Sequence, residues 1–198
     1  MTLDQIISFA AFSVIASITP GPSNVLLTAT GALVGIWRGM ACLFGVLAGM
    51  GSLMLLAALG LGSVITAFPA LLDAMKWLGA AFLLWLSWKI ATAPLAVGND
   101  ADRAAGFVTA AAFQWINPKS WLVSTSAVAT YLIPDASNAL AQSFVFAMVF
   151  VISALPSCFI WLSFGAGMDR LLRSERAARL FNAAMGLALA ASVLFILN

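Results

Sequence analysis

Two motifs place proline beside small polar residues inside apolar sequence, and their chemistry suits the binding of a carboxylate. The first is Thr19-Pro20-Gly21-Pro22-Ser23-Asn24, and the second is Asn117-Pro118-Lys119-Ser120. Proline removes a backbone donor and disfavours the helical conformation of the preceding residue, so we expect a helix to break at each motif. A helix that restarts at Pro22 offers free N–H groups and the positive end of its dipole, which together bind carboxylates. A kink that serves packing alone is the alternative interpretation.

Lys119 is the residue of the second motif that most needs a functional explanation. The alternative is that its side chain extends to the membrane surface and has no such role. A lysine near the bilayer centre costs about 2.5–3.5 kcal/mol on insertion scales, and the apolar sequence around it holds no acidic partner. We predict that Lys119 and the helix start at Pro22 bind a substrate carboxylate, while Gln114 and Asn117 contact the amino group or side chain. Burial disfavours an ammonium and a bound carboxylate favours it, so Lys119 is also our candidate for proton coupling. The predicted binding residues are Thr19, Pro20, Gly21, Pro22, Ser23, Asn24, Gln114, Asn117, Pro118 and Lys119.

The composition predicts that helices crossing a membrane position these motifs. The chain is 63% hydrophobic and 8% charged, with a mean hydropathy of +1.07, whereas soluble domains are roughly 25% charged. Uncharged blocks span 5–37, 39–72, 136–168 and 180–198, and each reaches the length of about 18 residues that indicates a spanning helix. Blocks 77–94 and 104–134 also qualify if Lys89 and Lys119 are accepted within them. We therefore predict an all-α membrane protein with six transmembrane helices, at about 5–34, 39–67, 77–93, 104–134, 139–168 and 180–198.

The chain divides into two halves of three helices within a single transmembrane domain, 1–198. We expect a first repeat at 1–94, a polar cytoplasmic linker at 95–103 and a second repeat at 104–198. Because three is odd, the fourth helix enters in the direction opposite to the first, as an inverted repeat requires. The two proline motifs should then meet near mid-membrane. Ala41, Gly45 and Gly49 recur every four residues and predict a face for close helix packing.

The basic residues indicate that both termini lie outside. With the N-terminus outside, seven of the nine basic residues fall on or near the cytoplasmic side: Arg38, Lys89, Arg103, Arg170, Arg173, Arg176 and Arg179. The positive-inside rule therefore predicts N-out and C-out. The net charge of +2 reflects this asymmetry and gives no reason to expect nucleic acid. Residues 1–4 lack the basic region of a cleaved signal peptide, so we expect the first helix to be retained.

The chain resembles the LysE/RhtB family of amino-acid exporters over essentially its whole length. The similar stretches are 19–24, 77–86 (Trp-Leu-Gly-Ala-Ala-Phe-Leu-Leu-Trp-Leu) and 114–119 (Gln-Trp-Ile-Asn-Pro-Lys). Stretches 88–94 and 129–134 are most similar to the branch that exports cysteine and O-acetylserine. The resemblance implies six helices in two inverted halves, residence in the bacterial inner membrane, and efflux of amino acids or their derivatives in exchange for protons. The family motifs map onto Pro20, Gly21, Pro22, Asn24, Asn117, Pro118 and Lys119.

The expected partners are a small amino-acid substrate, protons, the lipid bilayer and further copies of the chain in a homo-oligomer. Histidine is absent and the two cysteines show no metal-ligand spacing, so we expect no cofactor and no enzymatic activity. One alternative is a membrane thiol oxidoreductase that uses Cys42 and Cys158, whose depths we estimate to differ by about 12 Å at helical rise. The other is a passive channel or scaffold in which the breaks serve only packing.

Overall fold

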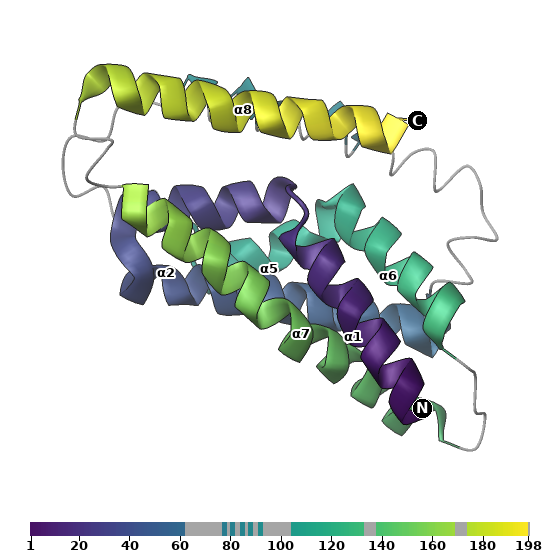
Figure 1. Ribbon diagram of the computed structural model, residues 1–198. Helices are drawn as coiled ribbons and strands as arrows, with labels where there is room; N and C mark the ends of the chain where they lie inside the picture. The colour runs from purple at the N-terminus through teal and green to yellow at the C-terminus, as the bar shows by residue number, and fades with distance from the viewer. Residues whose placement is uncertain are drawn as a thin grey trace.

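All the secondary structure in the described part of the chain is helical, which confirms the predicted all-α class. The computed structural model describes residues 1–61, 77–78, 80–81, 84–85, 87–88, 91–92, 104–132, 138–168 and 174–197. Its helices are α1 (Leu3–Ile18), α2 (Pro22–Leu56) with the π-helix η1 (Ala57–Leu61), α5 (Phe107–Ile116), α6 (Pro118–Tyr131), α7 (Ala139–Met168) and α8 (Glu175–Leu197) (Figure 1). Described residues of the helix expected at 77–93 are helical up to Ala91. The expected linker 95–103, and the basic residues Lys89, Arg103, Arg170 and Arg173, lie outside the described residues.

The helix ends at the two motifs follow from their local chemistry. Thr2 and Gln5 form a capping box that begins α1, and this helix ends at Ile18, before the first proline. α2 then begins with Pro22 at its first position, where a missing N–H costs nothing. The same arrangement recurs later in the chain, where α5 ends at Ile116 and α6 begins with Pro118.

The connection between the first two predicted helices is shorter than expected. We predicted a connection between residues 34 and 39, but the chain stays helical on both sides of a single interruption at Gly35. Gly35 has φ 75°, a left-handed conformation that glycine adopts without steric cost. α2 bends there, so that residues 22–34 and 36–56 run as two differently directed segments (Figure 1).

Glycines allow the helices around the motifs to pack closely against one another. A Cβ on Gly31 would overlap the carbonyl oxygen of Leu162 in α7, and one on Gly165 would overlap that of Thr28 in α2. Gly49, in the predicted small-residue face, leaves room for the side chain of Gln114, because an added Cβ would lie 2.6 Å from its Cγ. This face therefore packs against α5, and it positions a predicted binding residue.

The outer surface suits lipid contact. Two described helices, Pro22–Gly60 and Ala139–Met168, are each long and apolar enough to cross a bilayer. Shorter apolar helices span Leu3–Ile18, Phe107–Ile116 and Arg179–Ala191. Large apolar side chains are exposed along several helices, including Ile15 at 65% and Ile152 at 64%. α8 lies over one side of the bundle (Figure 1) and packs on Ala80 and Ala91, and Ser87 Oγ donates a hydrogen bond of 2.7 Å to Gly186 O.

Candidate functional site

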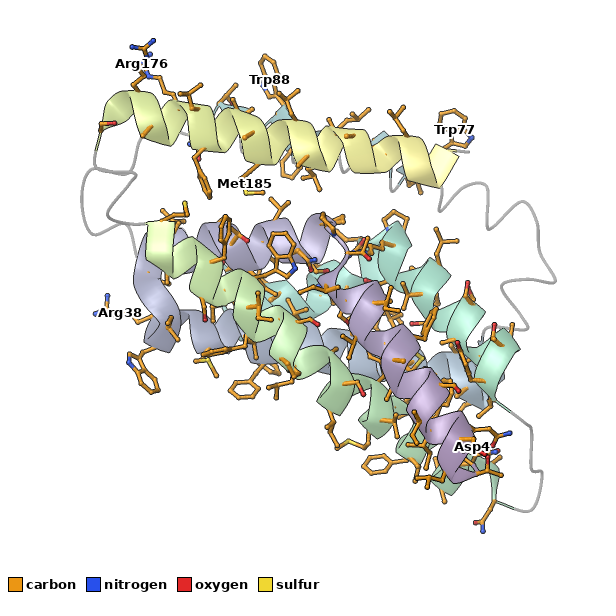
Figure 2. All side chains as sticks on the ribbon, viewed as in Figure 1. Asp4, Arg38, Trp77, Trp88, Arg176 and Met185 are labelled. Atoms are coloured by element: carbon orange, nitrogen blue, oxygen red, sulfur yellow. The ribbon has the colours of Figure 1, made fainter. Side chains whose placement is uncertain are left out.

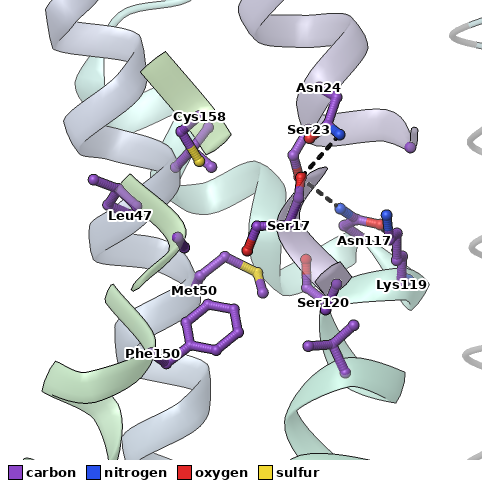
Figure 3. Close-up of a pocket in the computed structure, with 15 residues that line it drawn as sticks. Ser17, Ser23, Asn24, Leu47, Met50, Asn117, Lys119, Ser120, Phe150 and Cys158 are labelled. Atoms are coloured by element: carbon purple, nitrogen blue, oxygen red, sulfur yellow. Dashed lines mark hydrogen bonds between the residues drawn. The ribbon is translucent and has the colours of Figure 1, made fainter. Parts of the chain in front are cut away.

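The two proline motifs meet through side-chain hydrogen bonds, although they lie far apart in the sequence. Asn117 Nδ2 donates to Ser23 Oγ at 3.0 Å (Figure 3), and Ser23 Oγ donates to Gln114 Oε1 at 2.8 Å. Ser120 Oγ donates to the same Gln114 oxygen at 2.9 Å. Gln114 and Asn117 are 0% and 1% exposed, and buried polar groups of this kind are stable only when they are paired. The network therefore joins the break before α2 to the break before α6.

Lys119 reaches across this junction to the end of α1. Its Nζ donates to Thr19 O at 2.5 Å and to Pro20 O at 3.3 Å. Asn24 Nδ2 also donates to Thr19 O, at 2.9 Å, and to Ser17 O, at 3.1 Å. The last carbonyls of a helix lack partners within the helix and carry the negative end of its dipole. The apolar sequence around Lys119 offers no carboxylate, and backbone oxygens are its electrostatic partners instead.

The two helix starts differ in the amides that they leave open. At α6, Asn117 Oδ1 accepts from Lys119 N at 3.1 Å, and Asn117 O accepts from Ser120 N at 3.0 Å. Asn117 therefore caps α6 and satisfies its first amides. At α2, Asn24 N and Val25 N both donate to Gly21 O. No described residue accepts a hydrogen bond from Gly21 N or Ser23 N, so open amides lie at the first motif.

A cavity of about 40 Å³ lies between the motifs and α7. Its polar lining consists of Ser17, Gly21, Ser23, Asn24, Asn117, Lys119 and Ser120. Its apolar lining consists of Ala16, Val46, Leu47, Met50, Val123, Phe150, Ala154 and Cys158. Figure 3 shows Leu47, Met50, Phe150 and Cys158 on the side of the space opposite Ser23, Asn117 and Lys119. The volume suits about three waters at 10–15 Å³ each, so a larger ligand requires Lys119 or the helices to move.

The two cysteines are free thiols in the same buried cluster. Thr30 Oγ1 donates to Cys42 Sγ at 3.6 Å, and Cys158 lines the cavity. Among the described residues, no group of three histidine, cysteine, aspartate or glutamate side chains could hold a metal ion.

The sequence model of the family described as "LysE type translocator" matches residues 14–197. This chain belongs to the LysE-type translocator family. The curated relatives include cysteine/O-acetylserine efflux proteins of Salmonella choleraesuis (strain SC-B67) at 34% identity, Salmonella typhi at 33% and Escherichia coli O157:H7 at 31%. Each match covers 135 residues, which are 68% of this chain and 69% of the relative. No solved structure is significantly similar.

The match confirms the family resemblance and identifies the chain as a helical membrane protein of an amino-acid export family. The relatives also confirm the resemblance of this LysE-type translocator to exporters of cysteine and O-acetylserine. The chain is therefore assigned to the transporters rather than to the enzymes.

The predicted binding residues of this LysE-type translocator lie together, and they contribute in different ways. Gly21, Ser23, Asn24, Asn117 and Lys119 line the cavity. Thr19 and Pro20 contribute backbone carbonyls, and Pro22 and Pro118 set the starts of the two helices. Gln114 is absent from the cavity lining and supports it by accepting hydrogen bonds from two hydroxyls.

Several lining residues were missed by sequence reasoning. Ser120 lies in the second motif but was left out of the predicted set, although its serine hydroxyl was a visible signal. Phe150, Ala154 and Cys158 are spaced four residues apart in α7, so they share one helix face. That spacing was visible in the sequence, but the pattern is equally typical of ordinary core packing.

Proposed function

We propose that this protein exports amino acids or amino-acid derivatives across the bacterial inner membrane, by alternating access and in exchange for protons. The single observation that carries the proposal is the meeting of two interrupted helices at a cavity that has both polar and apolar lining. Helices broken near the bilayer midplane often form the substrate sites of transporters. The names of the curated relatives, which describe efflux of cysteine and O-acetylserine, support a small amino acid as the substrate.

We propose for the fold two inverted repeats, 1–94 and 104–198, joined by 95–103, with six membrane-spanning helices and both termini outside. Each repeat would contribute one broken helix, α1 with the start of α2 in the first and α5 with α6 in the second. In both, a half-helix begins with proline, and side-chain hydrogen bonds join the two motifs at these starts. Rocking of one repeat against the other would expose the cavity to each side of the membrane in turn.

We propose that the polar side of the cavity holds the backbone part of the amino acid. The open amides of Gly21 and Ser23 lie at the positive end of α2 and suit a carboxylate. Lys119 is close enough to assist, because a Cβ on Gly21 would lie 3.0 Å from Lys119 Nζ. Asn117 borders the same space and is our candidate contact for the amino group or side chain. Gln114 does not line the cavity, and we propose that it acts by orienting the hydroxyls of Ser23 and Ser120. The apolar side, with Phe150 and Ala154, suits an uncharged side chain of modest size.

Lys119 is the proposed carrier of the coupled proton. Of the residues that line the cavity, Lys119 and Cys158 are the ones that can titrate. The charged side chains of Asp4, Arg38 and Arg176 lie at the edges of the molecule (Figure 2). A bound substrate carboxylate favours the charged form of this lysine, so the departure of the substrate can be linked to loss of a proton before the side chain returns to the carbonyls.

A panel of amino acids tests the substrate class. Cells that overproduce the protein should resist growth inhibition by its substrates, and we expect relief for cysteine, O-acetylserine and other small neutral amino acids. Lys119→Met, which we expect to lose export, serves as the negative control. Relief by no amino acid would contradict the proposal, and flux that ignores the proton gradient would favour a passive channel. Full export by a Cys42→Ala/Cys158→Ala variant would exclude thiol redox chemistry.

A further inference from the structure

Two backbone carbonyls that directly follow α1 bind the ammonium group of Lys119. Thr19 O and Pro20 O converge on one nitrogen, Lys119 Nζ. Asn24, which is 5% exposed, braces the same turn by donating to Ser17 O and Thr19 O. Carbonyl oxygens at the C-terminus of a helix attract cations, and an ammonium brings three donors to them.

We propose that these carbonyls form the binding site for the α-ammonium group of the transported amino acid, with Lys119 as a tethered occupant that the substrate displaces. The inference rests on the proposed function, and it assigns the amino group to backbone oxygens rather than to Gln114 or Asn117. Those two amides are already engaged, because Gln114 Oε1 accepts from two hydroxyls and Asn117 Oδ1 accepts from Lys119 N.

The position of the Lys119 side chain means that its ammonium needs to move only a short distance during the exchange. A Cβ on Gly21 would lie 2.8 Å from Lys119 Cδ and 3.0 Å from its Nζ, so the side chain passes directly over Gly21. The ammonium therefore contacts the carbonyls of the first motif and lies next to Gly21, whose amide is open. A carboxylate bound at those amides attracts Lys119 away from Thr19 O and Pro20 O, and the substrate ammonium takes the vacated oxygens. Neither cation is left without a partner during the exchange.

The exchange requires a substrate that carries both charged groups. A carboxylate is needed to draw Lys119 away, and an ammonium is needed to replace it. A compound with the amine alone cannot compete with the tethered lysine, whereas it can bind once that lysine has been removed. Tighter binding of an amine after removal of Lys119 is expected if this lysine occupies the ammonium site. It is not expected if the lysine only holds the helices together.

Binding of three related thiols to the purified full chain tests the inference. L-cysteine carries both groups, cysteamine lacks the carboxylate, and 3-mercaptopropionate lacks the amine. For the wild-type chain we expect binding of L-cysteine, and binding at least about tenfold weaker for both analogues, as expected for the loss of a hydrogen bond to a charged group. For Lys119→Met we expect cysteamine to bind at least about tenfold more tightly than to the wild-type chain. Arg38→Met, which removes an exposed positive charge elsewhere, should behave as wild type.

The outcomes distinguish the inference from the proposed function. Equal binding of L-cysteine and 3-mercaptopropionate to the wild-type chain would overturn the inference, and this comparison needs no variant. Failure of cysteamine to bind folded Lys119→Met would also overturn the inference, but it would not contradict the proposed export function. If neither L-cysteine nor O-acetyl-L-serine bound the wild-type chain, the proposed function and the inference would fail together.

Discussion

Substitution of Gly21 by alanine tests the placement of Lys119 without removing its charge. Gly21 has φ −177° and ψ −177°, an extended backbone that alanine also adopts. The three heavy atoms nearest to the added Cβ all belong to Lys119, namely Cδ at 2.8 Å, Nζ at 3.0 Å and Cε at 3.4 Å. The main steric effect of the methyl group is therefore to displace this side chain.

The size of the effect follows from those distances. Cδ must move by about 0.7 Å to reach the 3.5 Å contact distance of carbon atoms. Carried along the side chain to Nζ, this displacement lengthens the 3.3 Å bond to Pro20 O to about 4.0 Å, which is no longer a hydrogen bond. Loss of a hydrogen bond from a charged donor costs about 1.5–3 kcal/mol. On the scale of soluble domains of 150–250 residues, this lowers the melting temperature by about 3–12 °C.

A double-mutant cycle measured by thermal unfolding in detergent supplies the assay. We expect Gly21→Ala to lower the melting temperature of the wild-type chain, and to have little effect in a Lys119→Ala background, where the methyl group has room. Gly106→Ala is the matched control, because Gly106 also precedes a helix start and an added Cβ meets no atom within 4 Å. Effects of Gly21→Ala that are equal in the two backgrounds, within about 0.5 kcal/mol, would refute the reasoning.

Two further predictions concern α7. Gly165→Ala places a methyl group on the carbonyl oxygen of Thr28, and no side-chain movement relieves that overlap, so we expect loss of monodisperse protein in gel filtration. Gly167→Ala, with no atom within 4 Å of the added Cβ, should elute as wild type, and equal behaviour of the two variants would contradict the close packing. Ala154→Leu fills the apolar side of the cavity, so we expect export in whole cells to fall by at least about tenfold. Ala112→Leu, at an exposed position of α5, should export normally, and normal export by Ala154→Leu would show that the cavity does not hold substrate.

Much of the site could be anticipated because proline acts locally. A missing donor at residues 20, 22 and 118 limits where a helix can continue, whatever surrounds it, and the helices end at Ile18 and Ile116. The cost of burying a lysine likewise indicated that Lys119 has a partner. These inferences needed only residue types and positions.

The partners themselves could not be read from the sequence. Lys119 contacts backbone oxygens, and every residue carries one, so no residue type marks the contact. The amides at the start of α6 are capped because Asn117 Oδ1 accepts from Lys119 N in its own helix. The amides at Gly21 have no such cap and stay open. The predicted break between residues 34 and 39 includes Gly35, but its length of one residue could not be read from the sequence, because glycine is compatible with a helix as well as with positive φ.

Transport by purified protein in lipid vesicles tests the central claim most directly, namely that Lys119 at the meeting of the two motifs couples amino-acid export to protons. Vesicles loaded with a substrate from the amino-acid panel are diluted into medium more acidic than their interior. We expect the wild-type chain to accelerate efflux as protons enter, and folded Lys119→Met to lose both the efflux and its dependence on the pH gradient. Efflux by Lys119→Met at the wild-type rate, with the same response to pH, would contradict the account.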